Sequence, residues 1–216
     1  MRRDVDINEI SDGRRYKSSD MVKVGCSDCR GCSECCRQVD DTIILDPYDI
    51  WQFKKGLNLT FDEMLAENTE PVIELGLADG LLLPHLKINT TAGACSFLGS
   101  DGRCTIHAFR PGFCRLYPLG RIYENGGFSY FIQINECPYQ GKTKVKIKKW
   151  LGINDLPSYE AFVLKWHDIL EEKRNGLTAI TDQSERSRYI VDFLKRFYQD
   201  PYDEARPFYE QFNERV

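Results

Sequence analysis

The chain has 216 residues and a formal net charge of −4; 42% of its residues are hydrophobic and 29% are charged. This apolar content is enough for a folded core and excludes an intrinsically disordered chain. The acidic balance gives no overall electrostatic reason to bind nucleic acid or an anionic membrane, and no apolar stretch is long enough to span a bilayer.

The first predicted elements follow a polar N-terminal arm, residues 1–24. A helix is predicted over residues 45–57, because Asp46 can act as the N-cap and Pro47 suits the first helical position. The apolar residues of this segment recur on one side, which is typical of a helix that packs on a core.

A second helix is predicted over residues 60–68, since Thr60 and Glu63 have the spacing of a capping box. Residues 71–88 predict two short strands, and the Asp-Gly pair at residues 79–80 supplies the turn between them. We therefore expect a hairpin directly after the second helix.

Three further elements are predicted in the second half of the chain. Residues 127–137 alternate apolar and polar side chains, which predicts a half-buried strand. Residues 156–176 predict an amphipathic helix with Gly176 as its stop signal, and residues 184–200 predict another. These two helices would form an amphipathic C-terminal extension.

The cysteines lie in the first two thirds of the chain. The N-terminal segment lacks the apolar stretch of a secretory signal, so we expect a cytoplasmic protein whose thiols stay reduced. An odd number of cysteines also cannot all be paired in disulfides. Metal binding is therefore favoured over a disulfide framework. The nine residues are Cys26, Cys29, Cys32, Cys35, Cys36, Cys95, Cys104, Cys114 and Cys137.

The run CSDCRGCSECC, residues 26–36, has a spacing typical of metal sites. Two residues between cysteines allow a tight loop to turn both sulfurs to one side, which suits tetrahedral zinc and iron–sulfur clusters. The last gap, counted to Cys36, reproduces a bacterial ferredoxin run. The alternative is that the cysteines pack as small apolar residues, and the polar residues between them disfavour it.

Cys35 and Cys36 place a constraint on any metal site. Adjacent residues of an extended chain point to opposite sides, so we expect these two to serve different centres, or one to be a spare thiol. Nine cysteines would fill two four-ligand sites with one left over. Cys26, at the edge of the run, is the residue we expect to be dispensable.

A second cysteine block, residues 93–121, reads GACSFLGSDGRCTIHAFRPGFCRLYPLGR. This block and the first run together resemble the YkgJ-type cysteine-cluster family over about residues 24–140. The flagellin lysine N-methylases look similar through the same cluster. The resemblance implies a zinc- or iron-chelating domain, and it is carried by Cys29-x2-Cys32-x2-Cys35-Cys36, then Cys95, Phe97, Cys104, Arg110-Pro111, Cys114-Arg115 and Tyr117-Pro118.

All nine cysteines are candidate metal ligands. Arg110 and Arg115 bracket Cys114, and we expect their hydrogen bonds to moderate the negative charge of a thiolate site. His107 stands where the family often has an aromatic residue. Its spacing from Cys104 suits a ligand, but sulfur ligands are already in surplus, so we expect the ring to pack beside the cluster.

The residues favour a metal-binding protein that holds an iron–sulfur cluster, expected to be 4Fe-4S, or zinc. Cys137-Pro138 echoes the end of bacterial ferredoxin motifs and tilts this choice toward iron–sulfur. One alternative is an S-adenosylmethionine-dependent protein-lysine methylase, which rests on the resemblance alone. Another is a structural zinc module that binds a protein partner.

Catalysis is not favoured, because no G-x-G-x-x-G, G-x-S-x-G or HExxH motif occurs. If the chain is an enzyme, a methylase-like or iron–sulfur oxidoreductase activity is expected. The basic run at residues 142–150 is interpreted as a solvated face, so we expect no nucleic-acid partner.

These patterns together predict an α+β fold. It would have a small cysteine-rich core, stapled by metal and containing short strands and helices, followed by the helical extension. We expect three consecutive parts: a polar arm at residues 1–24, a metal-chelating domain at 25–141, and a basic linker with the helical extension at 142–216.

Overall fold

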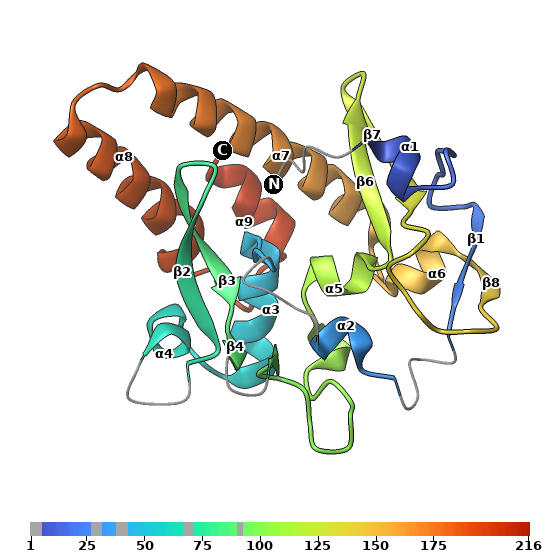
Figure 1. Ribbon diagram of the computed structural model, residues 1–216. Helices are drawn as coiled ribbons and strands as arrows, with labels where there is room; N and C mark the ends of the chain where they lie inside the picture. Colours follow the sequence, from blue (N-terminus) through green and yellow to red (C-terminus); the bar gives the residue numbers. More distant parts are fainter. Residues whose placement is uncertain (1–5, 27–31, 38–42, 67–70, 90–92) are drawn as a thin grey trace. The chain divides into compact units, whose positions relative to one another are not determined.

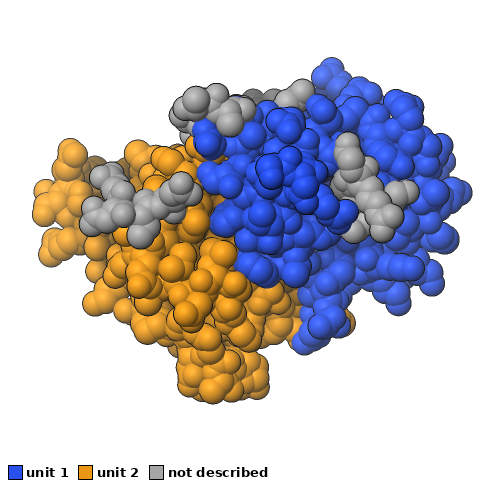
Figure 2. Space-filling model, turned by 90° about the horizontal axis from the view of Figure 1, so that it is seen from below, with its two compact units in different colours: residues 1–39, 89–156 blue, residues 40–88, 157–216 orange. Residues whose placement is uncertain are grey.

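The computed structural model describes residues 6–26, 32–37, 43–66, 71–89 and 93–216 (Figure 1). Helices and short strands are interspersed along the chain, and the last part is helical. The predicted α+β class is therefore confirmed. The chain divides into two compact units, which Figure 2 colours separately. Unit 1 comprises residues 1–39 and 89–156, and unit 2 comprises residues 40–88 and 157–216.

Each unit is made of two segments that are separate in the sequence. All nine cysteine positions fall within the ranges of unit 1. The three consecutive parts expected from the sequence stay a prediction. The two compact units divide the chain at other residues. The segment expected to be a polar arm contributes two elements to unit 1, α1 (Ile7–Ile10) and β1 (Met21–Gly25).

Unit 1 is built from pairs of short strands. β1 pairs antiparallel with β8 (Thr143–Lys146), although more than a hundred residues separate them. β6 pairs with β7. β5 (Ala94–Cys95) pairs with β4 (Ile88–Asn89), the strand at which the sequence passes from unit 2 into unit 1. The helices of the unit are short: α1, α2 (Glu34–Arg37), the 3₁₀ turn η2 (His107–Phe109), α5 (Gly112–Leu116) and α6 (Ile147–Leu151).

The strands β6 (Leu119–Glu124) and β7 (Gly127–Ile132) form a hairpin in full register. The two residues between them, Asn125 and Gly126, have φ of 53° and 70°. A two-residue hairpin turn of this kind needs positive φ at both positions, which Asn-Gly supplies. The sequence predicted only the second strand, over residues 127–137, and β7 ends five residues earlier than expected.

Gly120 in β6 leaves room for the ring of Phe131 on the paired strand. A Cβ built on Gly120 would lie 2.3 Å from the Phe131 ring. Gly120→Ala should therefore lower the free energy of unfolding by about 1–3 kcal/mol, because the ring must move. Gly127→Ala is the matched control, since its Cβ would meet nothing closer than 4.0 Å. Equal urea midpoints for the two variants would contradict this prediction.

Unit 2 begins with two helices whose N-termini were both predicted. α3 (Pro47–Leu57) has a capping box in which the Asp46 side chain accepts a hydrogen bond from the backbone N–H of Asp49. α4 (Phe61–Leu65) is capped in the same way by Thr60 and Glu63. The hairpin that follows also confirms the prediction, with β2 (Ile73–Ala78) paired to β3 (Leu81–Leu86).

The second segment of unit 2, residues 157–216, is mainly helical. α7 (Leu156–Ala179) runs through Gly176, so the prediction that this glycine stops the helix is wrong. A Cβ at Gly176 would lie 2.7 Å from the Tyr189 hydroxyl of α8 (Gln183–Leu194). The glycine instead leaves room for the Tyr189 side chain against α7. The chain then forms a π-helical turn, η3 (Lys195–Gln199), and α9 (Phe208–Glu214).

Aromatic side chains fill the interior of unit 2. Phe162 of α7 has its ring centroid 4.7 Å from that of Phe212 and 5.2 Å from that of Phe208, both on α9. Trp166, one turn along α7, packs edge-on against Phe197 at 5.2 Å. Edge-to-face contacts of this kind stabilise beyond the area that they bury.

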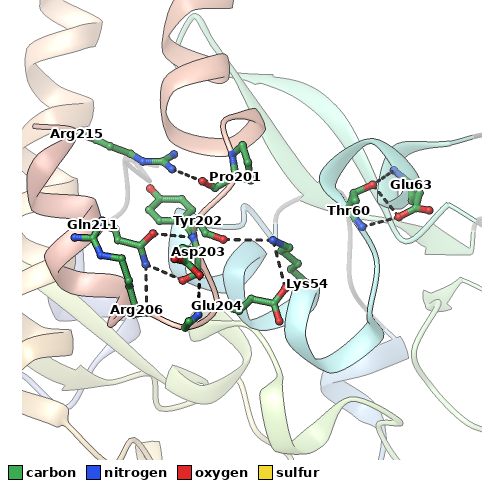
Figure 3. Close-up of polar contacts among 11 residues, drawn as sticks. Lys54, Thr60, Glu63, Pro201, Tyr202, Asp203, Glu204, Arg206, Gln211 and Arg215 are labelled. Carbon is green, nitrogen blue, oxygen red and sulfur yellow. Dashed lines mark hydrogen bonds and ion pairs between the residues drawn. The ribbon is translucent and has the colours of Figure 1, made fainter.

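Polar contacts fasten the segment before α9 (Figure 3). Lys54 of α3 donates to the backbone carbonyl of Tyr202 at 3.3 Å and forms an ion pair with Glu204 at 3.3 Å. Gln211 accepts a hydrogen bond from the backbone N–H of Asp203 at 2.7 Å. Arg215 donates to the carbonyl of Pro201 at 2.9 Å. The loop between η3 and α9 is therefore held by α3 on one side and by residues of α9 and its C-cap on the other.

Candidate metal site

The first cysteine run supplies three described thiols, Cys32, Cys35 and Cys36; Cys29 lies outside the described residues. Cys35 and Cys36 belong to α2, where the backbone N–H of Cys36 donates to the Ser33 carbonyl at 2.9 Å. A hydrogen bond with the Cys36 side chain raises the pKa of the Cys35 thiol. The extended chain assumed for these neighbours is wrong, because they lie on a helix and their side chains form a hydrogen bond. Their assignment to different centres, or of one to a spare thiol, stays a prediction.

Cys95 and Cys104 lie at the two ends of one tight loop. The Cys95 carbonyl accepts from the backbone N–H of Leu98 at 3.0 Å, and Leu98 bridges Cys104 as an antiparallel partner. Helix α2 packs against β5, which carries Cys95. Residues far apart in the sequence are thereby brought to one place.

The ionisation of these thiols is linked. Burial raises the pKa of Cys95, and the charges of Cys104 and Cys35 raise it further. Burial and the charge of Cys35 also raise the pKa of Cys104. We call the set Cys35, Cys36, Cys95 and Cys104 cysteine group 1.

Arg110 is the cation of cysteine group 1. Its charge lowers the pKa values of Cys104 and Cys35. This opposes burial and, for Cys35, the hydrogen bond with Cys36, which raise them. Its Nε atom is buried and has no hydrogen-bond partner among the described residues. One of its terminal nitrogens contacts Nε2 of His107, and because a guanidinium has only donors, the imidazole nitrogen accepts. That hydrogen bond occupies the His107 nitrogen and is in line with a packing role.

A second set of thiols lies at one end of the β1–β8 ladder. Gly25 pairs with Thr143 at that end, and the next residue along, Cys26, is 3% exposed. Lys142, which precedes Thr143, donates from Nζ to the Cys137 carbonyl at 2.5 Å. Both contacts place Cys26 and Cys137 at the same end of the ladder.

Electrostatics connects this second set with the first cysteine run. Burial raises the pKa of Cys137, the charge of Lys142 lowers it, and the charges of Cys26 and Cys32 raise it. We call the set Cys26, Cys32 and Cys137 cysteine group 2. Sequence reasoning missed Lys142 as a neighbour of this group, although it begins the basic run quoted above.

Tyr117 lies between the two cysteine groups. Its hydroxyl donates to the backbone carbonyl of Glu136, the residue before Cys137. Burial raises the pKa of Tyr117, and the charges of Glu136, Cys137, Cys35 and Cys32 add to the effect. The backbone carbonyl of Tyr117 accepts from the Trp150 indole at 3.2 Å. Tyr117 was part of the motif that carried the resemblance, but its position was not foreseen.

Cys114 and Arg115 lie on α5. Arg115 donates from Nε to the Arg110 carbonyl at 3.0 Å and from a terminal nitrogen to the Ala108 carbonyl at 2.6 Å. These bonds fix the backbone that leads from Cys104 to Cys114. The role of Arg115 in the structure is thus to hold this loop, while the predicted moderation of thiolate charge stays a prediction for it.

The donor chemistry of both groups fits a thiophilic metal, because thiolates are preferred by zinc and by iron–sulfur clusters. The buried Nε of Arg110 next to cysteine group 1 is left for a negatively charged neighbour, which a metal–thiolate centre would provide. Within the described part of the chain, no three His, Cys, Asp or Glu side chains are arranged so that they could hold a metal ion.

Comparison with known families identifies the cysteine-bearing part of the chain. A family model described as "CxxCxxCC: Putative zinc- or iron-chelating domain" covers residues 28–140, more than half of the chain. The chain belongs to the CxxCxxCC family. The match includes every cysteine except Cys26 and confirms the family resemblance expected from the motifs. No curated protein and no solved structure matches the chain.

The description of the family names zinc or iron chelation and does not choose between the metals. It agrees with the cysteine motif from which metal binding was predicted. Within the described residues, no helix of this CxxCxxCC protein is both long enough and apolar enough to cross a membrane.

Proposed function

We propose that this CxxCxxCC protein binds metal at two centres, each drawing its ligands from one cysteine group. The described thiols do not by themselves form a metal site, so the ligands of each centre must move together when the metal binds. The observation that carries the proposal is that α2 packs against β5, which joins thiols of the first cysteine run to those of the second block. Cys26 and Cys137 lie at the same end of the β1–β8 ladder, and the charges of Cys26 and Cys32 raise the pKa of Cys137. Two sets of thiols, each influenced by its own cation, support two centres.

The cations support this division. Arg110 accompanies cysteine group 1, and Lys142 accompanies cysteine group 2. A metal with four thiolates carries excess negative charge, which a nearby cation moderates. Cys29, which falls within the matched range of the family, is our candidate to complete group 2. Cys26, expected from the sequence to be dispensable, is then a member of that group.

We infer that the metal is iron in an iron–sulfur cluster, with zinc as the alternative. The ferredoxin-like spacing of the first run and Cys137-Pro138 support this choice. The test is to purify the protein without oxygen and to assay iron, acid-labile sulfide and zinc. A brown protein whose colour dithionite bleaches reversibly is expected. A colourless protein with stoichiometric zinc would overturn the iron–sulfur assignment, and tight binding of S-adenosylmethionine would favour the methylase.

Two centres can be distinguished from one by single and double variants. Cys104→Ser in group 1 and Cys137→Ser in group 2 should each leave about half of the metal bound, because serine is a poor ligand for thiophilic metals. The double variant should lose nearly all of it. Metal and sulfide per chain are the measurements. If either single variant loses as much metal as the double variant, the two groups share one centre.

A further inference from the structure

The exposed face of the β1–β8 ladder carries a set of lysines that the metal sites do not use. Met21 pairs with Lys146, and Lys23 pairs with Lys144, so these four side chains lie on one face of the ladder. The opposite face carries Val22, which is 3% exposed and belongs to the core. We call the exposed lysines of this ladder and of the helix after it the lysine ribbon: Lys23, Lys144, Lys146, Lys148 and Lys149.

The helix α6 extends the ribbon directly from β8. Its residues Ile147 and Leu151 are fully buried, which fixes the helix against unit 1 and leaves Lys148 and Lys149 in solvent. The lysines are therefore displayed by two elements of fixed position. Sequence reasoning treated residues 142–150 alone and missed Lys23, which only the strand pairing adds.

None of the five lysines forms an ion pair with a described residue. Lys23 and Lys144 are directly opposite each other, and like charges in this position destabilise a strand pair. Asp20, the carboxylate just before β1, accepts a hydrogen bond from the backbone N–H of Lys17 at 2.7 Å. The positive charges of the ribbon thus repel one another, and no ion pair with a described residue neutralises them.

The charge of the chain is divided unequally between the units. Unit 1 has 17 Lys and Arg against 11 Asp and Glu, a formal charge of +6; unit 2 has 12 against 22, a formal charge of −10. The net charge of −4 therefore conceals a basic cysteine-bearing unit. A basic surface of this kind attracts acidic partners and steers their approach.

We propose that the lysine ribbon is a docking surface for an acidic protein partner. Met21, 52% exposed beside Lys146, gives the surface an apolar centre, and methionine is enriched at protein interfaces. Nucleic acid fits less well, because single strands bind on exposed aromatic platforms. Trp150, the aromatic residue of α6, is half-buried and donates its indole N–H to the Tyr117 carbonyl.

The lysine ribbon lies next to cysteine group 2. The ladder ends at Gly25 and Thr143, next to Cys26 and to the Lys142–Cys137 hydrogen bond. A partner seated on the ribbon is held beside cysteine group 2. The use of this position rests on the proposed metal function, whereas docking itself depends only on the lysines and is tested without a metal assay.

The test uses the full-length protein and a fluorescein-labelled glutamate-rich peptide, with binding followed by fluorescence anisotropy at low ionic strength. Lys144→Gln/Lys146→Gln should weaken peptide binding about tenfold, and added salt should weaken the wild-type protein in the same way. Arg188→Gln/Lys195→Gln is the matched control, because it removes two exposed cations from unit 2. Circular dichroism should show that both variants are folded.

The two lysine residues chosen are exposed, so their loss leaves metal content unchanged and separates docking from metal binding. Equal peptide affinity in the ribbon and control variants would overturn the proposal. Tighter binding of a single-stranded oligonucleotide than of the peptide would replace it with a nucleic-acid surface. A dimer of the wild-type protein that dissociates in the ribbon variant would identify a second copy as the occupant and overturn it as well.

Discussion

Removing the metal should lower the free energy of unfolding of this protein by several kcal/mol, and by more than ~10 kcal/mol if the ion is a structural zinc. The reason lies in how unit 1 is built. The strands described in it occur in pairs, and an isolated two-stranded hairpin is marginally stable in water. Thiolate ligation would tie α2 and β5 together and close the end of the β1–β8 ladder.

This loss can be located within the chain. Trp150 lies in unit 1, whereas Trp51 and Trp166 lie in unit 2. The metal-free protein should lose the Trp150 fluorescence signal at lower denaturant concentration, while far-UV circular dichroism still reports the helix α7. Trp150→Phe is the control that identifies this signal. Unfolding of the metal-free and metal-loaded proteins at the same denaturant concentration would show that the metal is not part of the fold.

Phe162→Ala should lower the free energy of unfolding by about 3–5 kcal/mol. Phe162 is 3% exposed and its ring meets those of Phe208 and Phe212. Alanine would leave a cavity between α7 and α9 that these large rings cannot fill by small movements. The urea midpoint should fall, and the slope of the transition should stay the same.

Leu77→Ala is the matched control for this cavity, since Leu77 is an apolar residue of unit 2 that is 73% exposed. Its effect on the free energy of unfolding should be within about 0.5 kcal/mol. A Phe162→Ala protein as stable as Leu77→Ala would mean that the aromatic contacts of α7 do not support unit 2.

The parts of the fold that sequence could predict are those encoded locally. Asp46 and Thr60 cap their helices with side-chain hydrogen bonds to residues three positions away, so the signal lies in a few adjacent letters. The Asp79-Gly80 turn is local in the same sense. Asn125-Gly126 carried an equally strong hairpin signal, and β6 could have been predicted from it.

The remaining features depend on residues that are distant in the sequence. Nothing near Met21 indicates that β1 pairs with β8, because that partner is more than a hundred residues away. Gly176 looked like a helix stop, yet its role is set by Tyr189 on another helix. The cysteine motif predicted the family and its metal chemistry. The division of thiols into two groups needed the packing of α2 on β5 and the end of the ladder.

Unit 1 consists of two segments that are separate in the sequence, and this affects its synthesis on the ribosome. Residues 40–88 leave the ribosome after the first cysteine run and before the second block, yet they belong to unit 2. Cys137 is made about 100 residues after Cys36, which at bacterial and eukaryotic elongation rates is about 5–20 s later. Cys95 and Cys104, the partners of Cys35 and Cys36 in cysteine group 1, are made within that interval, whereas cysteine group 2 waits for Cys137. The order of translation thus leaves the early thiols of group 2 longest without their last partner, and in that period they can be oxidised or take up the wrong ion.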